Sequence, residues 1–167
     1  MFKSIQRHRE RTHRTQEQVA NMLLSTKSNI CNIEKGRRNV SSEILMTGFE
    51  RSDDPIFIKE MTYEFSNGYT TPSPSEKVYD DHRVCIKERL LNEINEVVEI
   101  LMKIRIDKRP DCCNKDDIED VRRIASETQD VIFEAQALID KIIIDYHLNP
   151  QELARTRNQR LKMERRI

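Results

Sequence analysis

Apolar residues recur with heptad spacing through one long stretch of this chain, residues 118–146. The steps between them are 3-4-3-4-3-4-3-4, with one threonine in the series. This period keeps the side chains on one face of a continuous α-helix and is typical of helices that pack lengthwise against others. A long packed helix is therefore the first element that the fold must accommodate. The residues of this seam are Ile118, Val121, Ala125, Thr128, Ile132, Ala135, Ile139, Ile142 and Tyr146.

A shorter seam of the same kind precedes this helix, within a helix predicted for residues 81–106. Pro110 makes it unfavourable for that helix to continue into the next one. Two helices joined by a short break predict an antiparallel hairpin. The residues of the shorter seam, in steps of 4-3-4-3, are Leu90, Ile94, Val97, Leu101 and Ile104.

The longer helix also carries a second apolar stripe, formed by Ile124, Val131 and Leu138. A single antiparallel neighbour cannot cover both stripes, so a third layer is predicted. Self-association into a four-helix bundle is the simplest source of that layer, and we expect a homodimer or a higher homo-oligomer. The residues predicted to mediate oligomerisation are Leu90, Ile94, Val97, Leu101, Ile132, Ile139 and Ile142.

The composition predicts an all-α protein. Charged residues make up 35% of the chain, and only three glycines and five prolines interrupt it. No apolar run approaches the roughly 20 residues that span a bilayer, and Met1 begins no secretion signal, so we expect a cytoplasmic, nucleoid-associated protein with no membrane partner. There is no Cys-x-x-Cys pair, and the adjacent Cys112 and Cys113 lack a nearby histidine. We therefore expect neither a metal nor a cofactor.

The net charge of zero conceals a basic beginning, an acidic middle and a basic end. The net charge is +5 for residues 1–51, −4 for residues 52–84, −5 for residues 85–148 and +4 for residues 149–167. This distribution suggests that only the two ends approach a polyanion such as DNA. Charge alone is equally compatible with a set of solvated helix faces.

The first 66 residues contain shorter helical patterns, predicted at 2–11, 16–24, 27–35, 42–51 and 55–65. Ser42 is the predicted cap of the fourth helix and Asp54 that of the fifth. An Asn-Gly step, prolines and several hydroxyls then indicate a linker. The predicted domains are residues 1–66, with a linker at 67–79, a helical hairpin at 80–148 and a basic helix or tail at 149–167.

Residues 16–35 predict two short helices that meet at a tight turn, with Ser25 or Thr26 capping the second. The solvent side of the second helix carries only side chains that can donate hydrogen bonds to phosphates or base edges, and none that is acidic. Gly36 ends this helix, and Arg37 and Arg38 follow at a distance suited to the DNA backbone. An ordinary helical hairpin is the alternative. The residues on the solvent side of this second helix are Lys27, Ser28, Asn29, Asn32 and Lys35.

These residues resemble the Cro/cI-type, or XRE-type, helix-turn-helix regulators of phages and bacteria. Residues 15–20, TQEQVA, resemble the start of that family's first motif helix, and residues 30–37, ICNIEKGR, resemble the end of its second. The resemblance covers about residues 1–65 and implies a five-helix DNA-binding domain. It implies that Arg9 and Glu34 form a structural ion pair. Its implied DNA contacts are Gln16, then Lys27, Ser28 and Asn32 as the main base contacts, with Thr26 and Asn29 nearby.

Two residues depart from the family's pattern. Leu24 stands where the family usually has glycine, at a turn position that often needs a positive φ. A leucine there costs about 1 kcal/mol or forces a different turn. Arg14 occupies a position that is more often apolar.

A sequence-specific DNA-binding transcriptional regulator, a repressor of phage or prophage type acting on a palindromic operator, is therefore the predicted function. Two alternatives remain. Glu96-x-x-Glu99 and Glu127-x-x-Asp130 resemble the carboxylate spacing of all-α nucleotide pyrophosphatases, which hold Mg²⁺. The seams predict that these carboxylates do not converge, so we expect no enzyme. The third possibility is a module that binds another regulatory protein.

Overall fold

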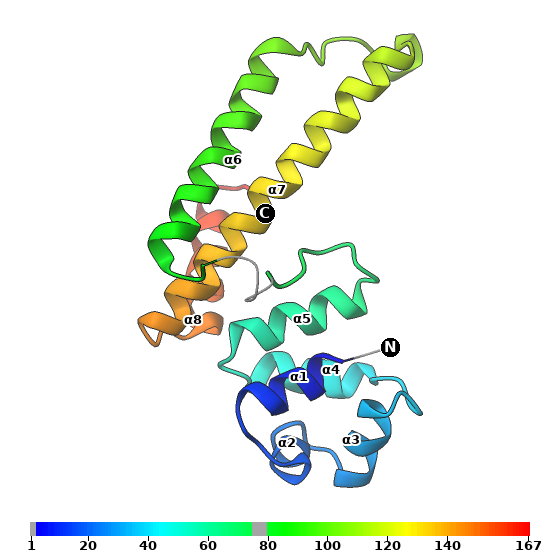
Figure 1. Cartoon of the computed structure of the whole chain (residues 1–167), viewed down its shortest axis with the longest axis vertical. Coiled ribbons are helices and arrows are strands. Elements are labelled where there is room, and N and C mark those ends of the chain that lie inside the picture. Colours follow the sequence, from blue (N-terminus) through cyan, green and yellow to red (C-terminus); the bar gives the residue numbers. More distant parts are fainter. Residues whose placement is uncertain (1–2, 75–79) are drawn as a thin grey trace. The chain divides into compact units, whose positions relative to one another are not determined.

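The computed structural model describes residues 3–74 and 80–167. Within that part of the chain there are eight α-helices, a short 3-10 turn and no strand, so the predicted all-α class is confirmed (Figure 1). None of these helices is long and apolar enough to cross a membrane. The chain forms two compact units, one of Met1–Ser73 with Ile142–Ile167 and the other of Pro74–Lys141. Residues 75–79 of the predicted linker, and residue 2 of the first predicted helix, lie outside the described residues.

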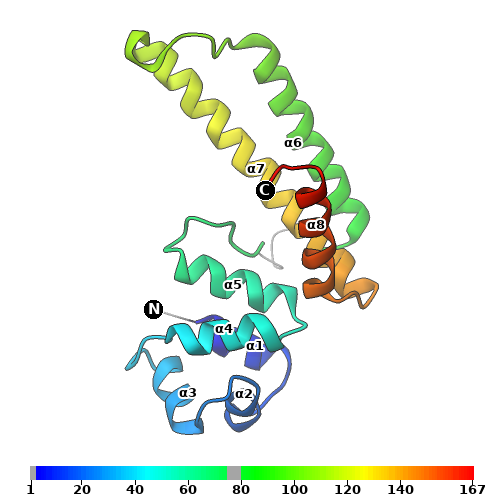
Figure 2. The ribbon, with the colours of Figure 1, turned by 180° about the vertical axis from the view of Figure 1, so that it is seen from behind.

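Five short helices make up most of the first unit and gather around one core in both views (Figures 1 and 2). The bounds of the fourth and fifth match the prediction, and the second and third end one or two residues earlier than predicted. The helices are α1 (Ser4–Arg11), α2 (Gln16–Met22), α3 (Lys27–Glu34), α4 (Ser42–Arg51) and α5 (Pro55–Phe65). We call α1–α5 the head.

Side-chain caps set where the helices of the head begin. The Thr15 hydroxyl accepts a hydrogen bond from the Gln18 backbone N–H while the Gln18 side chain accepts from the Thr15 N–H, which makes a capping box at α2. Thr26 caps α3, and Asp54 caps α5 as predicted. For α4 the prediction of Ser42 was wrong. Ser41 is the cap, because its hydroxyl lies three residues before the Ile44 N–H that it accepts from, whereas Ser42 is already in the helix.

The core of the head is apolar and receives side chains from every one of its helices. Phe57 of α5 is fully buried, and Ile5 of α1 is almost as deeply buried. Because burying such side chains is worth roughly 1.5–3 kcal/mol each, this cluster supplies most of the stability of the head. Its buried members are Ile5, Val19, Ala20, Leu23, Ile30, Ile33, Val40, Ile44, Leu45, Phe57 and Met61.

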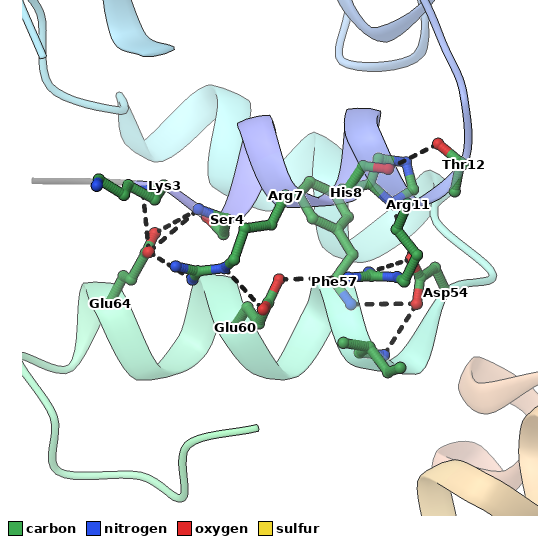
Figure 3. Close-up of polar contacts among 11 residues, drawn as sticks. Lys3, Ser4, Arg7, His8, Arg11, Thr12, Asp54, Phe57, Glu60 and Glu64 are labelled. Carbon is green, nitrogen blue, oxygen red and sulfur yellow. Dashed lines mark hydrogen bonds and ion pairs between the residues drawn. The ribbon is translucent and has the colours of Figure 1, made fainter. Parts of the chain in front are cut away.

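A ladder of ion pairs joins α1 to α5 along their shared length (Figure 3). At one end Glu64 accepts from the backbone N–H groups of Lys3 and Ser4, which would otherwise be unpaired at the start of α1. In the middle, Arg7 donates to Glu60 at 2.8 Å and to Glu64 at 2.8 Å. The ladder therefore holds α1 in register against α5.

Asp54 closes the other end of this ladder. Its carboxylate accepts from His8 Nδ1 at 2.8 Å and from Arg11 Nη2 at 2.6 Å, and it also accepts from the first N–H groups of α5. The His8 ring stacks on Phe57, with 4.3 Å between ring centroids. Burial raises the pKa of Asp54, but the hydrogen bonds from His8 and Arg11 outweigh burial and lower it from 3.8 to about 2.

The second unit is a helical hairpin of α6 (Arg83–Lys103) and most of α7 (Lys115–Asp145), joined through the 3-10 turn η1 (Pro110–Cys112). The inward face of α7 is the predicted second stripe rather than the long seam, and that of α6 keeps only part of the predicted shorter seam. The least exposed heptad positions of α6 are Ile86, Leu90, Glu93, Val97 and Ile100, followed by Ile104 directly after the helix. Those of α7 are Ile124, Glu127, Val131, Glu134 and Leu138.

An ion pair across the hairpin explains this rotation of the helices. Arg89 of α6 lies 3.1 Å from the buried carboxylate of Glu134 on α7, which turns Glu134 inward. The stripe one residue later on each helix is then turned outward. Ile94, Leu101 and Ile132 are therefore exposed, contrary to the prediction that the seams face inward.

The last helix, α8 (Pro150–Met163), is capped by Asn149, whose side chain accepts from the Glu152 N–H. It belongs to the same compact unit as the head. The Gln151 amide donates to the carbonyls of Phe49, at 3.1 Å, and Ser52, at 2.5 Å. These carbonyls lie at the end of α4, where intrahelical donors are no longer available. Gln151 thus caps α4 and fixes the start of α8.

The turn between α2 and α3 contains backbone strain that a substitution can relieve. Leu24 has φ of +50° and its side chain is 71% exposed, so it has the left-handed conformation that favours glycine and little packing to compensate. We expect Leu24→Gly to raise the free energy of unfolding by about 1 kcal/mol. Urea denaturation measures it. Leu24→Ala is the control, since it removes the exposed side chain but keeps the Cβ that makes positive φ unfavourable, and a gain equal to that of glycine contradicts the strain argument.

The lowered pKa of Asp54 predicts a loss of stability in acid. The carboxyl contributes stability above its unfolded pKa near 3.8, and the contribution disappears as pH falls through its folded pKa of about 2. Asp54→Asn should therefore lower the free energy of unfolding by about 2 kcal/mol at neutral pH and flatten its pH dependence between about pH 4 and pH 2. Denaturation at a series of pH values measures this. Asp53→Asn, a change at the neighbouring exposed carboxyl, is the control and should lower the free energy of unfolding at neutral pH by less than about 0.5 kcal/mol.

Candidate nucleic-acid interface

The orientation of α3 is set by its packing against α2. Val19, Ala20 and Leu23 of α2 are buried with Ile30 and Ile33 of α3 in the core of the head. Because these two isoleucines face inward, the opposite side of α3 faces solvent. The two helices and the turn between them thus make a rigid frame that presents one helix surface.

The outward side of α3 carries donors that no other described residue engages. Lys27, Ser28 and Lys35 are exposed, and Asn32 is half-buried. Within the described residues, no hydrogen bond or ion pair joins any of these four side chains to another group. An ammonium, a hydroxyl and an amide that are free in this way can donate to base edges or phosphates.

Thr26 and Asn29, which were expected near the base contacts, are instead engaged within the head. Thr26 Oγ1 accepts from the Asn29 N–H as the cap of α3, at 3.2 Å. The Asn29 side chain donates to Ser25 Oγ and accepts from Arg38 Nη1, both at 2.9 Å. These contacts hold the guanidinium of Arg38 beside α3. In the free protein, Thr26 and Asn29 therefore position other groups.

The segment after α3 brings two arginines to its C-terminal end. Gly36 has φ of +68°, the left-handed conformation that commonly ends a helix. Arg37 and Arg38 are both exposed, and within the described residues the Arg37 side chain has no partner. Two exposed guanidinium groups beside a donor-bearing helix suit a phosphate backbone.

Glu34 joins three helices of the head at the base of this surface. Its side chain, only 6% exposed, accepts from Arg9 Nε at 2.8 Å, from Arg9 Nη2 at 3.2 Å and from Gln16 Nε2 at 2.8 Å. The predicted Arg9–Glu34 pair is therefore present. The hydrogen bonds that Arg9 donates to Glu34 raise the pKa of Arg9 above its ordinary value. Gln16 keeps a second amide hydrogen, which is available to a phosphate at the start of α2.

The residues predicted for oligomerisation fall into three groups. Leu90 and Val97 lie on the inward face of the hairpin and are half-buried. Ile142 is half-buried and belongs to the same compact unit as the head. The remaining four are exposed on the hairpin, and they are Ile94, Leu101, Ile132 and Ile139.

Two of the four carboxylates that were predicted not to converge, Glu127 and Asp130, do converge in the hairpin, with Glu93 in place of Glu96 and Glu99. Oxygen atoms of Glu93, Glu127 and Asp130 all lie within 4.8 Å of one another. Burial raises the pKa of Glu93, and the charges of Glu96 and Asp130 raise it further. The prediction required Leu90, Ile94 and Val97 all to face inward, whereas Glu93 lies inward and Ile94 is exposed. The signal for it was its place in the series 86, 90, 93, 97.

No protein-family model matches this chain, and no curated protein or solved structure matches it significantly. The function must therefore be inferred from the geometry of the head and the hairpin.

Removing the carboxylate of Glu34 should destabilise the head. Glu34→Ala leaves Arg9 and Gln16 facing a site that water reaches poorly, so we expect a loss of about 2 kcal/mol in the free energy of unfolding. Chemical denaturation measures this. Glu10→Ala is a matched control: Glu10 accepts from Gln6 at 2.8 Å and lies 3.6 Å from Arg9, but it is exposed. The control should change stability by less than about 0.5 kcal/mol, and an equal loss in both variants contradicts a special role for Glu34.

Proposed function

We propose that this protein is a sequence-specific DNA-binding transcriptional regulator, a repressor of the phage or prophage type, that places α3 in the major groove. The observation that carries the proposal is the outward side of α3, where Lys27, Ser28 and Asn32 are uncommitted and no acid is present. A structural helix in a chain with 35% charged residues ordinarily mixes both signs on its solvent side.

The chemistry of this surface suits two kinds of DNA contact. Lys27, Ser28 and Asn32 can donate to base edges, which differ between base pairs in the major groove. Arg37, Arg38 and the free amide hydrogen of Gln16 are suited to phosphates, which orient the protein without specifying sequence. The buried core and the Glu34 contacts hold both sets at fixed positions before DNA arrives.

A palindromic site bound by two copies follows from the size of this surface. One short helix contacts only a few base pairs, and each correct contact discriminates by about 1–3 kcal/mol. Two heads bound to half-sites about 34 Å apart double the number of contacts. We therefore propose that the protein acts on a palindromic operator as a homo-oligomer.

A second candidate function is favoured by one observation, the converging carboxylates of Glu93, Glu127 and Asp130. Carboxylate oxygens are the ligands that Mg²⁺ prefers, and Mg²⁺-dependent hydrolysis of a nucleotide needs such a group. Magnesium titration by calorimetry, with a nucleotide hydrolysis assay, separates the two functions. Hydrolysis that Glu127→Gln abolishes, in a protein that selects no DNA sequence, favours the enzyme. A protein with neither activity is left as a module that binds another regulator.

The proposed function is tested by selecting bound sequences from random DNA with the full chain and then measuring affinity for the selected site. Lys27→Ala, Ser28→Ala and Asn32→Ala should each weaken that binding by about 1–3 kcal/mol and relax selectivity at one position. Arg37→Ala should weaken binding to all sequences equally, and it should lower the slope of log affinity against log salt concentration by about one. Lys87→Ala, at an exposed lysine of the hairpin that pairs with Glu88, is the control and should leave affinity unchanged. The proposal fails if no sequence is selected, or if all four head variants bind like the wild type.

A further inference from the structure

One side of the α6–α7 hairpin carries two apolar stripes that remain exposed. Their large aliphatic side chains are each between 37% and 53% exposed. The α6 stripe is Leu91, Ile94, Val98 and Leu101, and the exposed large residues of the α7 stripe are Ile118, Val121, Ile132 and Ile139. We call these eight residues the outer face.

Both stripes lie on the same side of the hairpin. The α6 stripe lies one residue after the inward positions 90, 93, 97 and 100, and the α7 stripe from residue 125 onward lies one residue after the inward positions 124, 127, 131, 134 and 138. One residue turns a helix by about 100°. Because the helices face each other and run in opposite directions, turning each by the same step in its own direction brings both stripes to one side. The outer face is therefore continuous across the two helices.

The α7 stripe is uncharged along its whole length. Between Ile118 and Ile139 its other members are Ala125, Thr128 and Ala135. In a chain with 35% charged residues, a solvated face of this length is expected to carry several charges. The absence of charge indicates that this side is covered in the working protein.

The hairpin also lacks enough buried apolar material to be stable alone. Within the described residues of this unit, the only buried apolar side chains are Ile86, Ile100 and Ala137. Glu93, Glu127 and Glu134 occupy inward positions that a self-sufficient hairpin would fill with apolar side chains. Small units with so little core usually need another chain or a cross-link to fold.

We infer that the outer face binds the outer face of a second copy of this chain, completing a four-helix bundle, and that the hairpin is fully folded only in that pair. A two-fold interface uses the same patch on both copies, so it must be self-complementary. The outer face meets this requirement. The middle of the α7 stripe is small, with Ala125, Thr128 and Ala135, and it can receive the larger side chains of the partner's α6 stripe.

The size of the outer face agrees with such a pair. The α7 stripe spans 21 residue steps, about 32 Å, the α6 stripe spans ten, about 15 Å, and each helix is about 10 Å wide, so the face projects to roughly 470 Å². A stable interface buries about 800 Å² of accessible surface on each partner, and accessible area exceeds projected area on a surface of ridges. A second copy of this chain is the partner that the proposed function requires. The pairing itself rests on the proposed function only for its biological role.

Light scattering on the full chain, at micromolar concentration and without DNA, tests the inference. One chain has a mass of 19.9 kDa, and the wild type should have twice that mass. The double variant Ile132→Lys with Ile139→Lys should have the mass of one chain. The matched control, Ser126→Lys with Asn92→Lys, adds the same charge at exposed positions away from the outer face and should stay dimeric.

Hydrogen exchange provides a second measurement that does not depend on a variant. On dilution of the wild type, amides of α6 and α7 should lose protection together with the dimer, while amides of α1–α5 keep theirs. The inference is overturned if the wild type is monomeric with a protected hairpin, if its mass is not that of two chains, or if the control dissociates as the outer-face variant does. A dimer that selects no DNA sequence counts against the proposed function and leaves the pairing intact.

Discussion

The hydrogen bonds that the carboxylate of Glu34 accepts are the interaction on which the arrangement of the head depends. An acid at the C-terminal end of a helix is unfavourable, because the helix dipole places partial negative charge there. In this chain the guanidinium of Arg9 and the amide of Gln16 compensate for that cost, and they come from α1 and α2. One buried group therefore fixes three helices together, and α3 can present its donors only in the orientation that this junction permits.

Much of the fold could be predicted because its signals are local. Asp54 followed by Pro55 marks the start of α5, and Asn149 followed by Pro150 marks that of α8, because a cap and a fixed φ act on neighbouring residues. The rotation of the hairpin could not be predicted in the same way. Two heptad stripes compete there, and hydrophobicity favours the one without charge. The Arg89–Glu134 ion pair stabilises the orientation in which the other stripe faces inward, and it joins residues 45 positions apart.

The candidate site shows the same division between local and long-range information. The donor-bearing side of α3 follows from helical spacing alone, so Lys27, Ser28 and Asn32 could be placed on it from the sequence. The engagement of Asn29 by Arg38 could not, because it depends on how the chain turns after Gly36. Glu93 was missed for a related reason, since a carboxyl was not expected at an inward heptad position.

The outer face and the α3 surface depend on each other in a way that affects how such a protein responds to its concentration. If the hairpin is ordered only in a pair, the free energy of pairing includes the entropy cost of ordering two hairpins. Pairing is then weaker than the apolar area alone suggests, and monomers are present when the protein is scarce. Under the proposed function, a monomer would offer one short helix and a few base contacts, too few to discriminate against genomic competitors. Occupancy of a palindromic site would then rise more steeply than in proportion to concentration, because ordering the hairpin, pairing the chains and binding two half-sites would occur together.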